Sequence, residues 1–306
     1  MNIDQDIHDH VLSTLPHKPA EAASLAALST QELVVRYLNW LSRGVRARPR
    51  KVHVSAKLNA NPLRSSAQYK GAVDALIAEI STGADLQPHL SRAMTIGYQA
   101  PQTGPKKLLA QRDLDLLLND WGVHHLHLST TVEADGFVTR TGPLLFAVFR
   151  PDDAYLVDIF KHGSWSDRGV VETIVREWPA AGLIGEAKGA LGLAHESSSE
   201  DIGLNRSAGI STALTIDERV YIPTGVSTAG TATVASLDAI GLRKAIRWLV
   251  DELATSPTYL TKVLAEHGHL PPPKPDWHFV LMTDGFGVQE RQTGIFLRLG
   301  FWRFLA

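Results

Sequence analysis

The sequence contains no cysteine, and this absence removes several kinds of chemistry at once. Disulfide frameworks, thiolate zinc sites and cysteine nucleophiles all require that side chain. Any metal site in this chain would therefore depend on histidine and carboxylate ligands.

Long apolar segments are missing as well. No run of about 18 apolar residues occurs, which is the length that a membrane-spanning helix requires. The first residues, MNIDQDIHDHVLSTLPHKP, are acidic and contain histidines instead of the apolar core of a signal peptide. We therefore expect a cytoplasmic protein with no membrane segment.

A strong excess of charge of either sign is also absent. The 306 residues include 30 basic and 32 acidic side chains, and the net charge of −2 argues against a surface that is positive all over. The net charge does not exclude a local basic patch. The hydrophobic content of 44% suffices for the cores of two ordinary domains.

The chain divides into three parts by its patterns. Residues 1–50 are expected to form an N-terminal helical arm, in which Ser29 and Glu32 have the spacing of a capping box. Residues 51–180 are expected to form a compact α+β domain. Residues 181–306 are expected to form a second, irregular α/β lobe of unknown role, with a strand at 219–222, a helix at 237–253 and a final strand pair.

A basic run lies between the first two parts. Basic residues recur at intervals of one to three positions before the first predicted strand: Arg43, Arg46, Arg48, Arg50 and Lys51. Two interpretations of this run are open, a solvated linker and a contact with phosphate groups.

The residue pattern of the central part, residues 51–180, predicts helices packed on a small antiparallel β-meander. A strand at 52–55 precedes a helical stripe at 68–80, and a short helix follows near 86–94. Three strand-like runs then follow at 123–131, 144–149 and 155–162, separated by Gly, Pro and Asp turn signals, with a closing helix at 169–178. The predicted fold class is therefore α+β.

Histidines gather on one predicted face of this meander. Because successive side chains of a strand point to opposite sides, His125, His127 and Ser129 share one face. Asp158 and His162 share a face of the third strand. If both strands bury their apolar sides together, all of these polar groups look outward from the same sheet.

Such a group could cleave RNA without a metal or another cofactor. Imidazoles act as general base and general acid near neutral pH, and a carboxylate can fix the tautomer of one of them. We expect His125 and His127 to be the acid–base groups, His162 to stabilise or protonate, and Asp158 to orient an imidazole. The candidate substrate-binding residues are Arg140, Lys161, Ser129, Ser164 and Trp165, of which Trp165 could stack on an unpaired base.

The order strand, helix, helix and three-strand meander, with the strands HHLHL, LLFAVF and YLVDIFKHGSW, resembles the RelE and HigB type of toxin ribonucleases and the wider group of small metal-independent RNases that includes barnase. The resemblance covers about residues 51–178. It implies RNA as substrate, with His125, His127 and His162 and also Arg140 at the scissile phosphate, and an antitoxin or immunity protein as partner. The chain departs from the group in having few Arg and Lys residues on its strands and large additions at both ends, which puts ribosome-dependent action in doubt.

Other functions remain open. His-x-His on a strand together with Asp158 also suits a divalent metal in a metal-dependent hydrolase. The two His-x-Ser motifs, which begin at His127 and His162, are typical of two-histidine phosphoesterases. A function of another class is a noncatalytic binding or assembly module of a mobile genetic element, in which the sheet face and the Gly/Ser/Thr segment recognise a protein.

Overall fold

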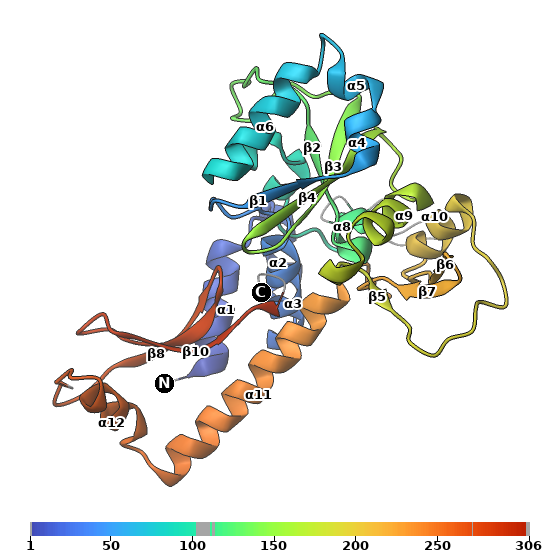
Figure 1. Ribbon diagram of the computed structural model, residues 1–306. Coiled ribbons are helices and arrows are strands. Elements are labelled where there is room, and N and C mark those ends of the chain that lie inside the picture. Colours follow the sequence, from blue (N-terminus) through green and yellow to red (C-terminus); the bar gives the residue numbers. More distant parts are fainter. Residues whose placement is uncertain (1, 102–110, 112–113, 271, 304–306) are drawn as a thin grey trace.

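The structure, a computed structural model, describes residues 2–101, 111, 114–270 and 272–303 (Figure 1). Helices and three small sheets follow one another without the regular strand–helix–strand repeat of a parallel sheet, which confirms the α+β class. Within these residues, no helix combines the length and the apolar character that crossing a bilayer requires.

The central sheet has four strands in the order β1, β4, β3, β2. Their bounds are β1 (Lys51–Val54), β2 (His124–His127), β3 (Pro143–Phe149) and β4 (Asp153–Lys161). Strands β2, β3 and β4 pair antiparallel, which confirms the predicted meander, and β1 joins β4 in parallel. Strand β2 therefore forms one edge of this sheet.

A β-bulge interrupts β4 at its polar residue. Phe146 of β3 faces Asp158, whereas the next pair along the ladder skips Val157. The additional residue puts Val157 and Asp158 on the same side and reverses the alternation beyond them. Ile159 accordingly packs in the core under one face, and Phe160 packs in the core under the other. The predicted alternation is right before the bulge and wrong after it.

Both faces of the central sheet are covered by helices. The helices of this part are α4 (Ala56–Ala60), α5 (Pro62–Ser65), α6 (Lys70–Thr82), η2 (Gln87–His89), η3 (Arg92–Thr95), α8 (Leu116–Trp121) and α9 (Arg168–Glu177). Leu126 and Leu145 point into the core under α6, while Leu144 and Phe146 point into the core under α8 and α9. Two-sided burial explains the continuous apolar run LLFAVF. The expectation that these polar groups look toward solvent is wrong for His127 and Asp158, which are 2% and 4% exposed, whereas His162 is exposed.

The ends of helices α8 and α6 hold the chain segments around the histidines in place. Asp115 is the N-cap of α8, and its side chain accepts the backbone N–H of Leu118. Gly83 ends α6 in the left-handed conformation at φ 81°, and a Cβ atom there would lie 2.4 Å from the backbone nitrogen of Pro49. The basic loop before β1 is thereby held against the end of α6.

The chain after α9 forms a small lobe that packs on the central unit. Its elements are η4 (Pro179–Ala181), β5 (Gly185–Glu186), α10 (Ser199–Ser207), β6 (Leu214–Ile216) and β7 (Arg219–Ile222). The strands form a sheet in the order β5, β7, β6, and β7 confirms the strand predicted at 219–222. Ile202, Leu214 and Tyr221 belong to the same core as the sheet residues under α9.

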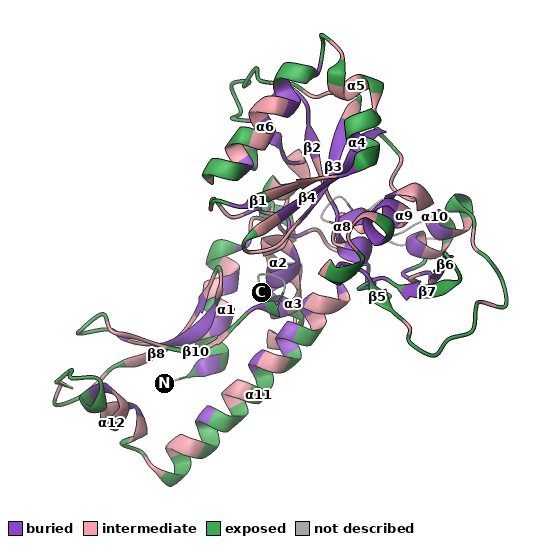
Figure 2. Cartoon of the chain, viewed as in Figure 1, coloured by how far each residue is buried: buried purple, intermediate pink, exposed green. Residues whose placement is uncertain are grey.

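The two ends of the chain share a separate core. Its elements are α1 (Ile3–Thr14), η1 (Pro19–Glu21), α2 (Ala22–Ala26), α3 (Thr30–Leu41), α11 (Thr233–Thr255), α12 (Tyr259–Glu266), β8 (Trp277–Met282), β9 (Gly285–Glu290) and β10 (Phe296–Phe301). Ile7 and Leu33 pack in it with Leu242 and Val288. Figure 2 shows the buried residues of α1, α3 and α11 as purple patches. This core joins segments that the sequence-based division assigned to an arm and to a separate lobe.

The capping box of α3 is confirmed. Ser29 accepts the backbone N–H of Glu32, and the Glu32 side chain accepts the backbone N–H of Ser29 in return. The final strand pair predicted near the end is a three-stranded sheet in the order β10, β9, β8.

Candidate active site

A cavity of about 550 Å³ lies where the N-terminus of α8, strand β2, the loop after β4 and helix α10 meet. The predicted residues His125, Arg140, His162 and Trp165 all line it. Strand β2 supplies His125, the connection from β2 to β3 supplies Arg140, and the segment after β4 supplies the other two. The structure therefore brings together part of the predicted histidine group, within a pocket rather than on an open face.

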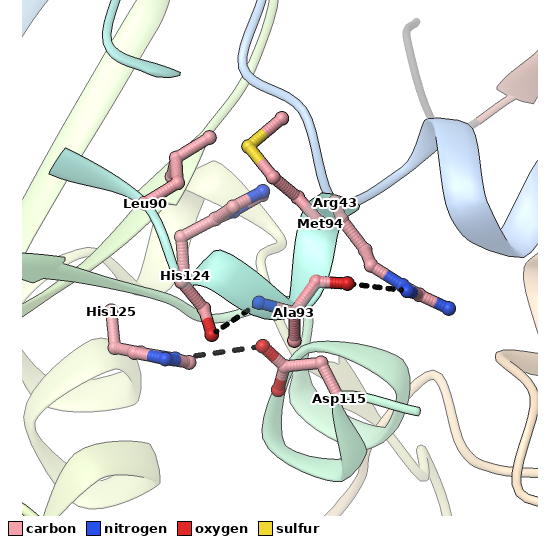
Figure 3. Close-up of a pocket in the computed structure, with 8 residues that line it drawn as sticks. Arg43, Leu90, Ala93, Met94, Asp115, His124 and His125 are labelled. Carbon is pink, nitrogen blue, oxygen red and sulfur yellow. Dashed lines mark hydrogen bonds and ion pairs between the residues drawn. The ribbon is translucent and has the colours of Figure 1, made fainter. Parts of the chain in front are cut away.

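A carboxylate that the sequence did not single out lies beside His125. Nδ1 of His125 is 3.5 Å from Oδ2 of Asp115, a distance within ion-pair range but long for a hydrogen bond (Figure 3). The other oxygen, Oδ1, accepts the N–H of Leu118 at 3.1 Å. Because the helix cap fixes this carboxylate, Nε2 is the His125 nitrogen that is available for proton transfer.

Trp165 links the two imidazoles of the cavity. Its ring centroid lies 4.8 Å from that of His125 and 5.0 Å from that of His162. The same indole is stacked on Phe146 of β3, with 5° between the ring planes. A rigid aromatic platform thus positions both imidazoles, which is a different role from the predicted stacking on a base.

Arg140 brings a permanent positive charge to this cavity. Burial, and then the positive charge of Arg92, lowers the pKa of Arg140 to about 10, so the guanidinium stays protonated at neutral pH. Its Nη1 donates to the carbonyl oxygen of Leu90 at 2.9 Å. This hydrogen bond orients the group and leaves further N–H donors for an anion.

The surroundings favour a neutral His125. Burial is the main cause that lowers the pKa of His125, and electrostatic interactions with Arg140 and His162 act in the same direction. Asp115 opposes them and raises this pKa. A neutral imidazole with a carboxylate at Nδ1 is suited to accept a proton at Nε2.

His127 lies outside the lining of the cavity. It is 2% exposed, and its Nδ1 accepts the backbone N–H of Thr141 at 3.0 Å. Burial, followed by nearby positive charge, lowers the pKa of His127 to about 3. The imidazole therefore stays neutral and holds the Thr141 turn, so the geometry gives it a structural role instead of the predicted acid–base role.

The predicted orienting role of Asp158 is wrong in this geometry. Its side chain accepts from Nδ2 of Asn61 at 2.7 Å and lies 3.6 Å from Nζ of Lys57. Strand β3 separates β4 from β2, so these two strands lie about 10 Å apart. The carboxylate beside a cavity imidazole is Asp115.

Three other predicted substrate-binding residues do not line the cavity. Oγ of Ser129 accepts the N–H of Thr131, the backbone N–H of Ser164 donates to the carbonyl of Lys161, and the Lys161 side chain is exposed. Gly163 and Ser166, which lie near Ser164 in the sequence, line the cavity instead.

Helix α10 supplies a wall that sequence reasoning missed. Arg206 is buried, pairs with Asp120 of α8 at 2.8 Å and lies 4.1 Å from the ring centroid of Trp121. It also donates to the carbonyl oxygen of Trp165. Arg206 therefore ties the loop of Trp165 to α8. An isolated arginine in a polar segment gives no sequence signal for such a pairing.

No family model matches the chain, and no match was found among curated proteins or among solved structures. Among the residues described, no group of three or more His, Asp or Glu side chains is placed to hold a metal ion.

Proposed function

We propose that the cavity is the active site of a metal-independent endoribonuclease of toxin or defence type. The observation that carries this proposal is the contact of His125 and His162 with the same indole, in a cavity that Arg140 also lines. Two imidazoles can supply the base and the acid, and a guanidinium can supply the charge stabilisation, that favour cleavage of a phosphodiester by an adjacent hydroxyl.

The reaction is a transesterification. Nε2 of His125 removes the proton of the 2′-hydroxyl, and the freed oxygen forms a bond to phosphorus. The bond from phosphorus to the 5′-oxygen breaks, and His162 donates a proton to that oxygen. Arg140 compensates the negative charge on the phosphate, and Asp115 stabilises the His125 imidazolium. The products are a 2′,3′-cyclic phosphate and a 5′-hydroxyl.

The resemblance to the RelE and HigB type of toxins supports the same reading. It motivates three further parts of the proposal: RNA as the substrate, an antitoxin or immunity protein as partner, and action in the cytoplasm. The paired histidines of a two-histidine phosphoesterase fit less well, because His127 lies outside the cavity lining.

Expression in bacteria tests the proposal. We expect wild-type protein to slow growth and degrade RNA, and His125→Ala and His162→Ala to lose about 10²-fold or more of the activity, as loss of an acid–base group does. Purified protein should cleave RNA in the presence of EDTA. The matched control is His269→Ala, which removes an exposed imidazole elsewhere. Loss of cleavage in EDTA would favour the metal alternative, and equal, harmless behaviour of all variants would contradict the proposal.

The binding-module alternative draws on a different surface. Helix α11 exposes Leu237, Ile240 and Trp248 by 43%, 45% and 47%, and the helical repeat puts these three side chains on one side of the helix. Apolar side chains exposed together on one side of a helix favour a contact with another protein. A stable complex that His125→Ala and His162→Ala leave intact, without RNA cleavage, would support this alternative.

A further inference from the structure

The basic run before β1 folds into a small pocket on the other side of β2. The pocket has a volume of about 60 Å³, space for several water-sized groups. Its lining includes Arg46, Arg48, Arg50, Arg150 and His124, and these five residues are called the arginine pocket below. The run supplies three of its arginines, and the turn between β3 and β4 supplies Arg150.

Arg50 holds the backbone of this pocket in place. It is 8% exposed, and its guanidinium donates to the carbonyl oxygens of Arg150, Arg46 and Arg48 at 2.8, 2.9 and 3.3 Å. These hydrogen bonds fix the positions from which the other three arginine side chains extend. The fold therefore holds the backbone that carries these arginines in place.

Positive charge exceeds negative charge in the arginine pocket. Arg48 pairs with Asp152 at 2.6 Å, in an ion pair whose carboxylate is 80% exposed. Arg46 lies 3.7 Å from Asp284, and that carboxylate also pairs with Arg298. Within the described part of the chain, the Arg150 side chain makes no ion pair with a carboxylate. Guanidinium groups that line one small pocket repel one another unless an anion lies between them.

His124 adds a buried polar group to the same pocket. Both of its ring nitrogens are buried, and neither makes a well-formed hydrogen bond with a described residue, although the backbone of Ser42 is close enough to raise the pKa of His124. Its ring lies edge to face against Phe149, with the centroids 5.4 Å apart. Burial is the main cause that lowers the pKa of His124, to about 4, so the neutral ring can donate one N–H to an anion. A buried donor without a well-formed hydrogen bond is unfavourable, and a bound anion that accepts the N–H of His124 would remove this penalty.

The arginine pocket and the active-site cavity lie on the two sides of β2. His124 and His125 are consecutive residues of this strand and point to opposite faces. Both of them line a narrow space with Arg43 and Met94, which Figure 3 shows. Strand β2 is the edge of the sheet, and its neighbouring residues His124 and His125 line one pocket each.

We propose that the arginine pocket binds a phosphate group of the RNA strand at a position away from the bond that is cleaved. This inference rests on the proposed function, because it assigns the second phosphate to the strand that the cavity cleaves. Guanidinium groups bind phosphate oxygens with two parallel hydrogen bonds, and backbone phosphates are the group that an RNA strand presents at regular intervals.

Binding of RNA to a cleavage-deficient protein tests this inference. In the His162→Ala background, Arg150→Gln should weaken binding of a fluorescent single-stranded oligoribonucleotide by about tenfold at low salt and reduce the salt slope by about one. Arg48→Gln should act in the same direction, and Arg150→Lys should lose less. The matched control is Arg247→Gln, an exposed arginine of α11. Thermal unfolding of each variant shows whether it is folded.

The outcomes separate the two proposals and the two sources of phosphate. The inference is overturned if the Arg150→Gln and Arg48→Gln variants bind the oligoribonucleotide as tightly as the Arg247→Gln variant does. Unchanged RNA affinity with weakened binding of inorganic phosphate would also overturn it, because the pocket would then bind a free anion. If wild-type protein cleaves no RNA but Arg150→Gln still weakens RNA binding, the catalytic proposal fails and the arginine pocket stands.

Discussion

At the residue scale, the behaviour of His125 depends on Asp115. The carboxylate is held by the α8 cap and raises the pKa of an imidazole that burial lowers. The sequence shows Asp115 before an apolar helical segment, which is the pattern of an N-cap. Its contact with His125 could not be predicted, because the two residues belong to different elements that meet only in the folded chain.

We expect Asp115→Asn to reduce RNA cleavage by roughly tenfold or more, a part of the 10²–10⁴-fold contribution of an acid–base pair. The amide removes the charge that raises the pKa of His125, so this pKa falls further. The acid limb of the kcat/KM profile, which reports the neutral form of the base, should therefore move to lower pH. A smaller rate with an unmoved acid limb would show that Asp115 acts on structure alone.

The stability of the fold should depend on the protonation of His127. Its pKa is about 3 in the folded chain, against an ordinary value of 6.5 when unfolded. Below pH 6.5 the unfolded chain binds a proton that the folded chain does not bind, so this contribution to stability is present above pH 6.5 and is lost as the pH falls toward 3. His124, with a pKa of about 4, acts in the same direction.

Urea unfolding at a series of pH values measures this effect. We expect the free energy of unfolding to fall between pH 6.5 and pH 4, by up to about 1.4 kcal/mol per pH unit for each such imidazole. His127→Asn keeps an acceptor for the N–H of Thr141 and should reduce the slope, whereas His269→Asn should leave it unchanged. Equal slopes in wild type and His127→Asn would show that His127 titrates normally in the folded protein.

At the element scale, α8 and α10 are joined through a buried ion pair. Arg206 and Asp120 are 4% and 1% exposed at their side chains and lie 2.8 Å apart.

The meander, the α3 cap and strand β7 could be predicted from local sequence patterns. The bulge at Val157 could not, because a bulge is a relation between two strands and the strand pattern YLVDIF shows no break.

Arg206→Ala should destabilise the protein by about 3–5 kcal/mol, because it leaves the Asp120 carboxylate buried without its partner. The double variant Asp120→Asn with Arg206→Met should recover a large part of this loss, since no uncompensated charge remains. Urea unfolding monitored by tryptophan fluorescence gives both values. A single variant as stable as wild type would contradict the assignment of Arg206 as the link between the two helices.

At the scale of the whole molecule, the cavity and the cores are built from distant segments. The residues of α10 complete a pocket whose histidines lie in the central sheet, and α1 and α3 share a core with α11 and β8–β10. Periodicity predicts which face of an element is apolar, but not which other element covers it. For this reason the sequence predicted an open histidine face, whereas the structure has a sheet that is covered on both faces, with a pocket at its edge.

The product of the reaction gives the most direct test of the central claim, that His125 and His162 act as a metal-independent acid–base pair on RNA. Purified protein should be incubated with a dinucleotide in EDTA and the products identified by mass spectrometry. We predict a 2′,3′-cyclic phosphate from wild type, and none from His125→Ala or His162→Ala in the same time. A 5′-phosphate product, or the same cyclic product from both variants, would contradict it.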